Sequence, residues 1–205
     1  MKHLPFFSLL FAITVLIWSG IGVEDRFTWW LEIVPALIVF PILLLTYNKF
    51  RFTDMVYVLM AIHAAILMVG GHYTYAKVPI GFWLGDLFHA GRNSYDGIGH
   101  LAQGFVPALV ARELLLRTSP LKQGRWLNWL VVLSCLGISA SYELIEALVS
   151  ILTGDGADAF LGTQGDIWDT QKDMALAGIG AIAAIATCGR LHDRALMRQK
   201  HDAAK

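Results

Sequence analysis

Long apolar runs are the feature that most constrains the fold of this sequence. A bilayer has a hydrocarbon core of about 30 Å, which a helix of about 20 apolar residues can cross. Runs of about this length occupy residues 4–22, 29–47, 55–71, 97–116, 126–152 and 172–188. The chain is 56% hydrophobic and 16% charged, whereas a soluble domain carries about 25% charged residues. The sequence therefore predicts an all-α fold: a polytopic transmembrane bundle of about six helices, in a single membrane domain over residues 1–205.

The connection over residues 72–95 is too polar and too interrupted to span a membrane, yet it is too apolar to lie free in water. It contains Pro79 and the aromatic residues Phe82 and Trp83. We expect a re-entrant or interfacial segment that caps the bundle on its outer side. The Gly- and Asp-rich stretch 153–171 is predicted to be a loop, in which Asp155 and Asp158 are solvated.

The positive charges indicate an orientation. Lys and Arg collect in the loops that stay in the cytoplasm, and 12 of the 16 Lys and Arg residues lie at one set of span ends. That set includes both termini. The sequence therefore predicts a multi-pass protein with both termini in the cytoplasm, and it places the residues 72–95 and 153–171 on the opposite side.

Four of the segments carry acids or histidines at one level near the outer side of the membrane, and in three of them these residues recur at helical spacing. Asp96, His100 and Gln103 continue a stripe that starts at Asn93, with offsets of 3, 7 and 10 residues. On a membrane helix such a stripe must face the bundle interior or a cavity filled with water. The other polar residues at this level are His72 at the end of the third span, Ser139, Glu143, Glu146 and Ser150 on the fifth, and Asp166, Asp169 and Asp173 at the start of the sixth.

Six carboxylates in one small cavity would repel one another and would require protons or cations. Carboxylate oxygens with imidazole nitrogens suit a divalent metal ion such as Mg, Mn, Fe or Zn. The expected metal ligands are Asp96, His100, Glu143, Asp166, Asp169 and Asp173, and the expected catalytic residues are Glu143, Glu146 and His72. The alternative is a structural polar network, in which Arg92 and Lys172 act as counter-ions.

Other conspicuous residues have simpler interpretations. His63, alone in the apolar third span, is predicted to be a hydrogen-bonded core histidine. Ala177, Gly180 and Ala184 are predicted to let helices pack closely. Cys135 and Cys188 both lie in apolar runs, which favours neither a disulfide nor a metal site made of cysteines.

Four sequence blocks resemble the YjdF-like family of bacterial inner-membrane proteins. They are Gly71-His72-Tyr73-Thr74-Tyr75-Ala76, Asn93 to His100, Ser141 to Glu146 and Gly165 to Met174. The resemblance covers nearly the whole chain and implies a six-span protein of the bacterial inner (plasma) membrane, with no established activity. A looser similarity to VanZ-like membrane proteins rests on a helix that carries Glu and is followed by an Asp-x-x-Asp pair.

Two classes of function remain open. One is a metal-dependent membrane hydrolase or transferase that acts on a lipid or a lipid-linked substrate. The other is a transporter, or a protein that binds cations or protons, although no internal repeat is evident and few polar residues continue toward the inner side. The expected partners are membrane lipids. No nucleic-acid surface or nucleotide loop is evident, and no sequence feature specifies an oligomeric state.

Overall fold

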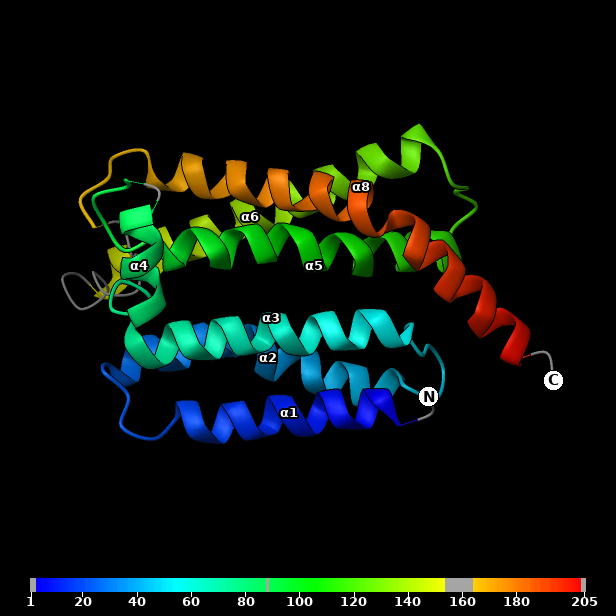
Figure 1. The fold of residues 1–205 in the computed structure, drawn as a ribbon, viewed down its shortest axis with the longest axis horizontal. Coiled ribbons are helices and arrows are strands. Elements are labelled where there is room, and N and C mark those ends of the chain that lie inside the picture. Colours follow the sequence, from blue (N-terminus) through cyan, green and yellow to red (C-terminus); the bar gives the residue numbers. More distant parts are fainter. Residues whose placement is uncertain (1–2, 88, 154–163, 204–205) are drawn as a thin grey trace.

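The computed structural model describes residues 3–87, 89–153 and 164–203, and all regular secondary structure in this part of the chain is helical (Figure 1). The helices are α1 (Leu4–Ser19), α2 (Arg26–Thr46), α3 (Asp54–Tyr73), α4 (Pro79–Leu87), α5 (Tyr95–Thr118), α6 (Arg125–Thr153) and α8 (Asp169–Ala203). The expected all-α bundle is confirmed. The predicted loop residues Asp155 and Asp158 lie outside the described residues.

Four of the helices, α2, α3, α6 and α8, are long and apolar enough to cross a membrane. The helix α1 is apolar but has only 16 residues. The helix α5 has 24 residues but is less apolar, because it carries acids, histidine and arginine along its length. The described residues thus contain four candidate spans and one shorter apolar helix, and the predicted count of about six is reached only if α1 and α5 also span.

Local sequence signals explain where the helices begin and end. Asp25 caps α2 by accepting a 2.6 Å hydrogen bond from the backbone N–H of Thr28. This bond favours the charged form, so it lowers the pKa of the Asp25 carboxyl. The helix α5 ends just before Ser119, which precedes a proline and is extended. The last helix continues past the predicted end of its span at residue 188 to Ala203. Hydropathy ends the apolar run there, but the polar residues that follow still favour a helix.

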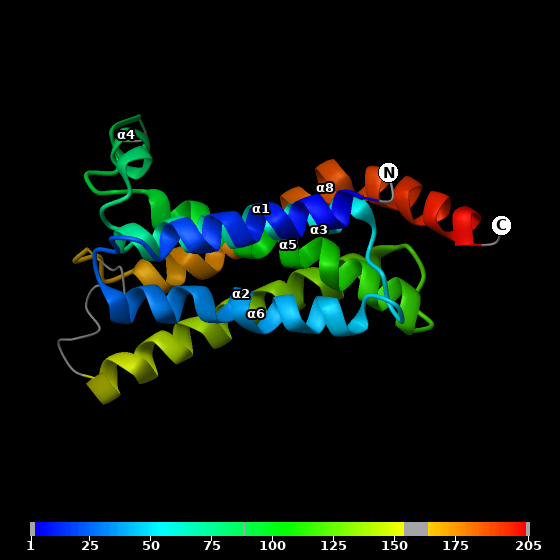
Figure 2. The same cartoon turned by 90° about the horizontal axis from the view of Figure 1, so that it is seen from below.

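The long helices form two groups of three. The helices α1 and α2 pack on α3, and α6 and α8 pack on α5, while contact between α3 and α5 joins the groups. Both termini lie at one end of the bundle, and α4 runs across the opposite end (Figures 1 and 2). We call these the terminal end and the α4 end. An even number of spans requires the termini to share an end, as observed.

The helices α5 and α8 approach each other more closely than ordinary side chains would permit. A Cβ atom added at Gly104 would lie 1.8 Å from the carbonyl oxygen of Ala177, and one added at Gly180 would lie 2.1 Å from that of Leu101. Ala181 and Ala184 are fully buried nearby. The small residues of the last span therefore serve close helix packing, as predicted.

The predicted polar stripe of α5 differs from the structure at its first residue, Asn93. Asn93 lies before α5 rather than on it, and its side chain organises the connection instead. Its Nδ2 donates to the carbonyl of Val78 at 2.9 Å, and its Oδ1 accepts from the N–H of Tyr95 at 3.0 Å. The amide of Gln164 bonds both backbone groups of Asn93. These bonds place the start of α5, and hence Asp96, beside the start of α8.

Candidate metal centre

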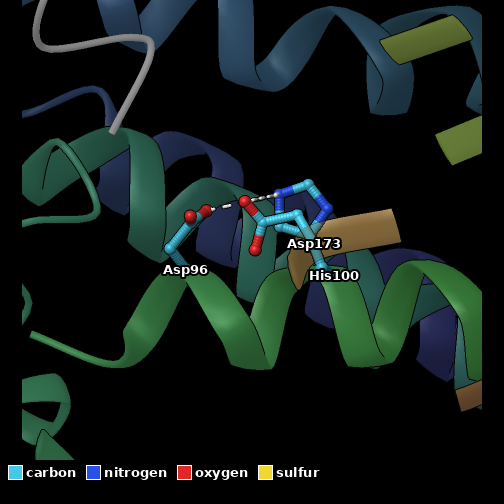
Figure 3. A group of neighbouring side chains, drawn as sticks. All are labelled: Asp96, His100 and Asp173. Carbon is cyan, nitrogen blue, oxygen red and sulfur yellow. Dashed lines mark ion pairs between the residues drawn. The ribbon is translucent and has the colours of Figure 1, made fainter. Parts of the chain in front are cut away.

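Three candidate metal ligands meet at the α4 end of the bundle. Asp96 and His100 lie one helical turn apart on α5, and Asp173 reaches them from α8 (Figure 3). Nε2 of His100 lies 3.5 Å from Oδ1 of Asp96 and 3.9 Å from Oδ2 of Asp173. One ligand atom from each residue lies within 4.8 Å of the other two. We call these three residues the triad.

The other ring nitrogen of His100 faces α6. Its Nδ1 lies 3.1 Å from Oε1 of Gln103 and 3.8 Å from Oε1 of Glu143. Glu143 is 8% exposed, and its Oε1 has no hydrogen-bond partner among the described residues. Glu146, one turn further along α6, is also buried. The predicted stripe of α6 therefore does face inward at Ser139, Glu143 and Glu146.

The two remaining predicted ligands form a rim held by basic side chains. Nη2 of Arg92 lies 2.6 Å from Oδ1 of Asp169, and Nη1 lies 3.8 Å from Oδ2 of Asp166. Lys172 also binds Asp166, and this hydrogen bond, more than any other contact, lowers the pKa of that carboxyl. Asp166 and Asp169 thus have protein cations beside them. The network of acids, Arg92 and Lys172 that the sequence suggested is present at this rim.

His72, a predicted catalytic residue, contacts α1 and its own neighbour instead. Its Nδ1 lies 3.0 Å from the carbonyl oxygen of Ser19, and its ring lies 4.7 Å from that of Trp18 and 4.5 Å from that of Tyr73, measured between centroids. The contacts of His72 place it on the α1 side of α3, whereas the triad lies between α5 and α8. The structure therefore does not bring His72 into the cluster.

A cavity of about 340 Å³ begins at the triad and extends into the bundle between the two helix groups. Asp96, His100 and Glu146 line its polar end, with Tyr142 beside them. Its inner part is lined mainly by apolar residues of α2, α3 and α5: Ala36, Val39, Phe40, Met60, Ala64, Leu67, Val106 and Val110. A polar end joined to an apolar interior matches an amphipathic ligand better than a small ion alone.

Sequence reasoning missed Glu32, which is 4% exposed and lines this cavity. The hydroxyl of Tyr142 lies 3.4 Å from Oε2 of Glu32. A glutamate inside the apolar run 29–47 was the available signal, because an ionisable residue within a span is usually functional.

His63 also lines the cavity, and its buried Nε2 has no hydrogen-bond partner among the described residues. The prediction of a hydrogen-bonded core histidine is therefore not met at Nε2.

A second buried polar group, toward the terminal end, was also missed. Glu113 on α5 and His192 on α8 are both fully buried, with 3.0 Å between Oε2 and Nε2. Arg112 lies beside them and forms a 2.7 Å ion pair with Asp193. Polar residues therefore do continue toward this end, contrary to the expectation from the fifth span alone. They come from α5 and from the part of α8 that the sequence placed beyond the membrane.

The long apolar helices, together with polar residues buried between them, define a helical membrane protein of several spans. Residues 4–194 match the family described as predicted membrane protein DUF2238, and the chain belongs to that family. It is 47% identical over 191 residues to the inner membrane protein YjdF of Escherichia coli (strain K12), a match that covers 93% of this chain and 91% of that protein. The YjdF-like assignment is confirmed, whereas these comparisons do not show the similarity to VanZ-like proteins. No solved structure gives a significant match.

Proposed function

We propose that this chain is a multi-pass inner-membrane protein that binds a divalent metal ion at Asp96, His100 and Asp173. The metal would serve hydrolysis or group transfer on a lipid or a lipid-linked substrate. The observation that carries the proposal is the triad, whose ligand atoms lie within 4.8 Å of one another at the polar end of an amphipathic cavity. The inner-membrane location is supported by the name of the E. coli relative.

The environment of His100 supports a metal ligand at Nε2. If Nδ1–H donates to the amide oxygen of Gln103 at 3.1 Å, Nε2 carries a lone pair that faces the carboxylates of Asp96 and Asp173. Metal-binding histidines are commonly oriented in this way by a hydrogen bond at the other ring nitrogen. Burying carboxylates without enough compensating partners is costly, and Glu143 adds a buried carboxylate beside the triad whose Oε1 accepts no hydrogen bond among the described residues. A cation of charge +2 would relieve this cost.

The same arrangement supports hydrolysis or transfer. A divalent ion polarises a phosphoryl or carbonyl oxygen, and it lowers the pKa of a bound water. Glu143 is a buried carboxylate whose Oε1 lies 3.8 Å from Nδ1 of His100, close enough to the triad to serve as a general base, and the buried Glu146 lies one turn further along α6. The cavity would hold the apolar part of the substrate beside these groups. His72, which contacts α1, has no role in this proposal.

Metal binding can be tested by elemental analysis and by melting curves of the purified protein with chelator or with Mg, Mn or Zn. A metal at 100 times its Kd should stabilise the wild type by about 2.7 kcal/mol. Binding should strengthen from pH 6 to pH 8, because the ligands must first lose their protons. Asp173→Asn should weaken metal binding at least about tenfold. Asp166→Asn, just before the same helix, is the matched control and should change metal binding much less, because Lys172 and Arg92 already neutralise that acid.

The alternative, in which the acids form a structural polar network without a metal ion, predicts the opposite change in stability when one carboxylate is removed. If the triad is a metal site, removing one carboxylate relieves repulsion, so Asp173→Asn should stabilise the protein in chelator. If the acids only hold the bundle together, the same change should lower stability, and no metal should shift any curve. The second result would overturn the proposal.

A cation or proton transporter is the second candidate. The cavity lies between the two helix groups, and His63 and Gln103 continue polar atoms beyond the triad. Proteoliposomes that contain a dye sensitive to Mn or to pH would test it. Flux that Asp96→Asn abolishes would favour transport. Absence of flux, together with metal-dependent turnover of a lipid, would favour the enzyme.

A further inference from the structure

The cavity has an opening on the side of the helix bundle, between two of its long helices. Two residues that line the cavity are also exposed: Val39 of α2 is 39% exposed and Ile138 of α6 is 47% exposed. Figure 2 shows α2 and α6 along the same side of the molecule. The mouth therefore lies between these two helices, within the length of candidate spans. In a bilayer this mouth faces hydrocarbon, so what enters from the side is a lipid chain.

The size and lining of the cavity suit one such chain. Its volume of about 340 Å³ falls within the range of ligand pockets, about 300–1,000 Å³. From the mouth inward the wall is mainly apolar, and it includes the small residues Ala36 and Ala64, which are 4% and 5% exposed. These small side chains keep the interior of the cavity open.

Acidic side chains at the polar end of the cavity favour a lipid head group that carries a positive charge. Glu32 and Glu146 are buried acids of the wall that do not belong to the triad. The phenol of Tyr142 lies beside Glu32, and His100 is the histidine at this end. Two carboxylates at low dielectric favour a cationic group that can donate hydrogen bonds. A lipid phosphate would be repelled here unless its head also carried a positive charge.

We propose that the cavity binds a bilayer lipid that carries an ammonium head group, which enters between α2 and α6 and places that group against Glu32 and Glu146. This inference rests on the proposed function for the reaction, because it names the substrate class of the same site. The binding itself does not need the metal. The lipid chain lies in the apolar part of the cavity, and its polar linkage lies toward the triad.

Lipid retention by the purified protein tests the inference, with phosphatidylethanolamine and phosphatidylglycerol of identical chains as probes. Native mass spectrometry in chelator would measure the bound fraction of each lipid. The wild type should retain the ethanolamine lipid about tenfold more tightly, as expected for a hydrogen bond between charged groups. Glu32→Gln should abolish most of this preference while both lipids still bind. Equal retention of the two lipids by the wild type would overturn the head-group assignment.

A pair of tryptophan variants tests the place of binding. Val39→Trp should block the mouth and reduce the retention of both lipids at least about tenfold. Ile38→Trp is the matched control, because Ile38 is 56% exposed on the same helix and does not line the cavity. Unchanged retention in Val39→Trp would overturn the cavity as the binding place. Lipid selectivity without any metal binding would refute the proposed metal function and leave this inference standing.

Discussion

Glu113 illustrates how one residue can join three parts of the chain. Its carboxylate accepts hydrogen bonds from the N–H of Thr53 at 3.0 Å and from the Thr53 hydroxyl at 2.9 Å. It also forms a 2.6 Å ion pair with Arg117 and contacts Nε2 of His192 at 3.0 Å. The side chain is fully buried. It therefore ties α5 to the start of α3 and to the part of α8 beyond residue 188.

Glu113→Ala should destabilise the protein by about 3 kcal/mol, because removing one partner of a buried ion pair leaves the other uncompensated. The N–H of Thr53 would also lose its acceptor. Unfolding in detergent, followed by circular dichroism, measures the effect. Asp54→Ala is the control. It breaks the more exposed pair with Arg51 and should cost less than about 1 kcal/mol. Equal losses in the two variants would contradict this prediction.

At the scale of elements, the contact between α5 and α8 depends on glycine. The backbones meet at Gly104 and Gly180, where any Cβ would overlap a carbonyl of the other helix. This close approach also sets the triad, because Asp96 and His100 stand on α5 and Asp173 stands on α8. A change in the distance between the two helices would therefore change the distances within the triad.

Gly180→Ala should lower stability by about 2 kcal/mol, because a methyl group 2.1 Å from the carbonyl oxygen of Leu101 forces the helices apart. Metal binding should weaken in the same variant. Gly137→Ala on α6 provides the control, since nothing lies within 4 Å of its added Cβ and alanine favours a helix over glycine by about 1 kcal/mol. Thermal melts with and without metal separate the two variants. A melt of Gly180→Ala indistinguishable from the wild type would show that the contact can yield.

At the scale of the whole molecule, the two termini share one end (Figure 1), and the triad lies toward the other, because Asp96 and Asp173 are near the starts of α5 and α8. The excess of Lys and Arg at the terminal end leads us to propose that this end faces the cytoplasm. The triad and the polar end of the cavity would then lie toward the periplasmic face, where a substrate from the outer leaflet could reach them.

Reporter fusions test this orientation. Alkaline phosphatase, which is active only in the periplasm, should be inactive when fused after Gln123, between α5 and α6. It should be active when fused after Gly165, before α8. A fluorescent protein that matures only in the cytoplasm should give the reverse pattern at both sites. A cytoplasmic signal after Gly165 would place the triad on the cytoplasmic side and would exclude a periplasmic substrate.

Several features of this protein were determined by local sequence alone. Hydropathy placed the spans within a few residues of the helices, because burial in lipid requires each segment to satisfy its own backbone as a helix. Helical spacing placed Asp96 with His100, and Glu143 with Glu146, on common faces, because that periodicity is a property of a single helix. The last predicted span ends at residue 188, whereas α8 continues to Ala203, because hydropathy marks where a membrane span ends and not where a helix ends.

Only the tertiary structure decided which polar residues meet. The sequence predicted one cluster of six acids, but Arg92 holds Asp166 and Asp169 at a rim, and His72 contacts α1. Glu32, from a span that reads as apolar, lines the cavity instead. These outcomes depend on how each helix is rotated and on how closely neighbours approach. Both are set by packing between segments far apart in the chain, such as α5 on α8, and no local pattern encodes them.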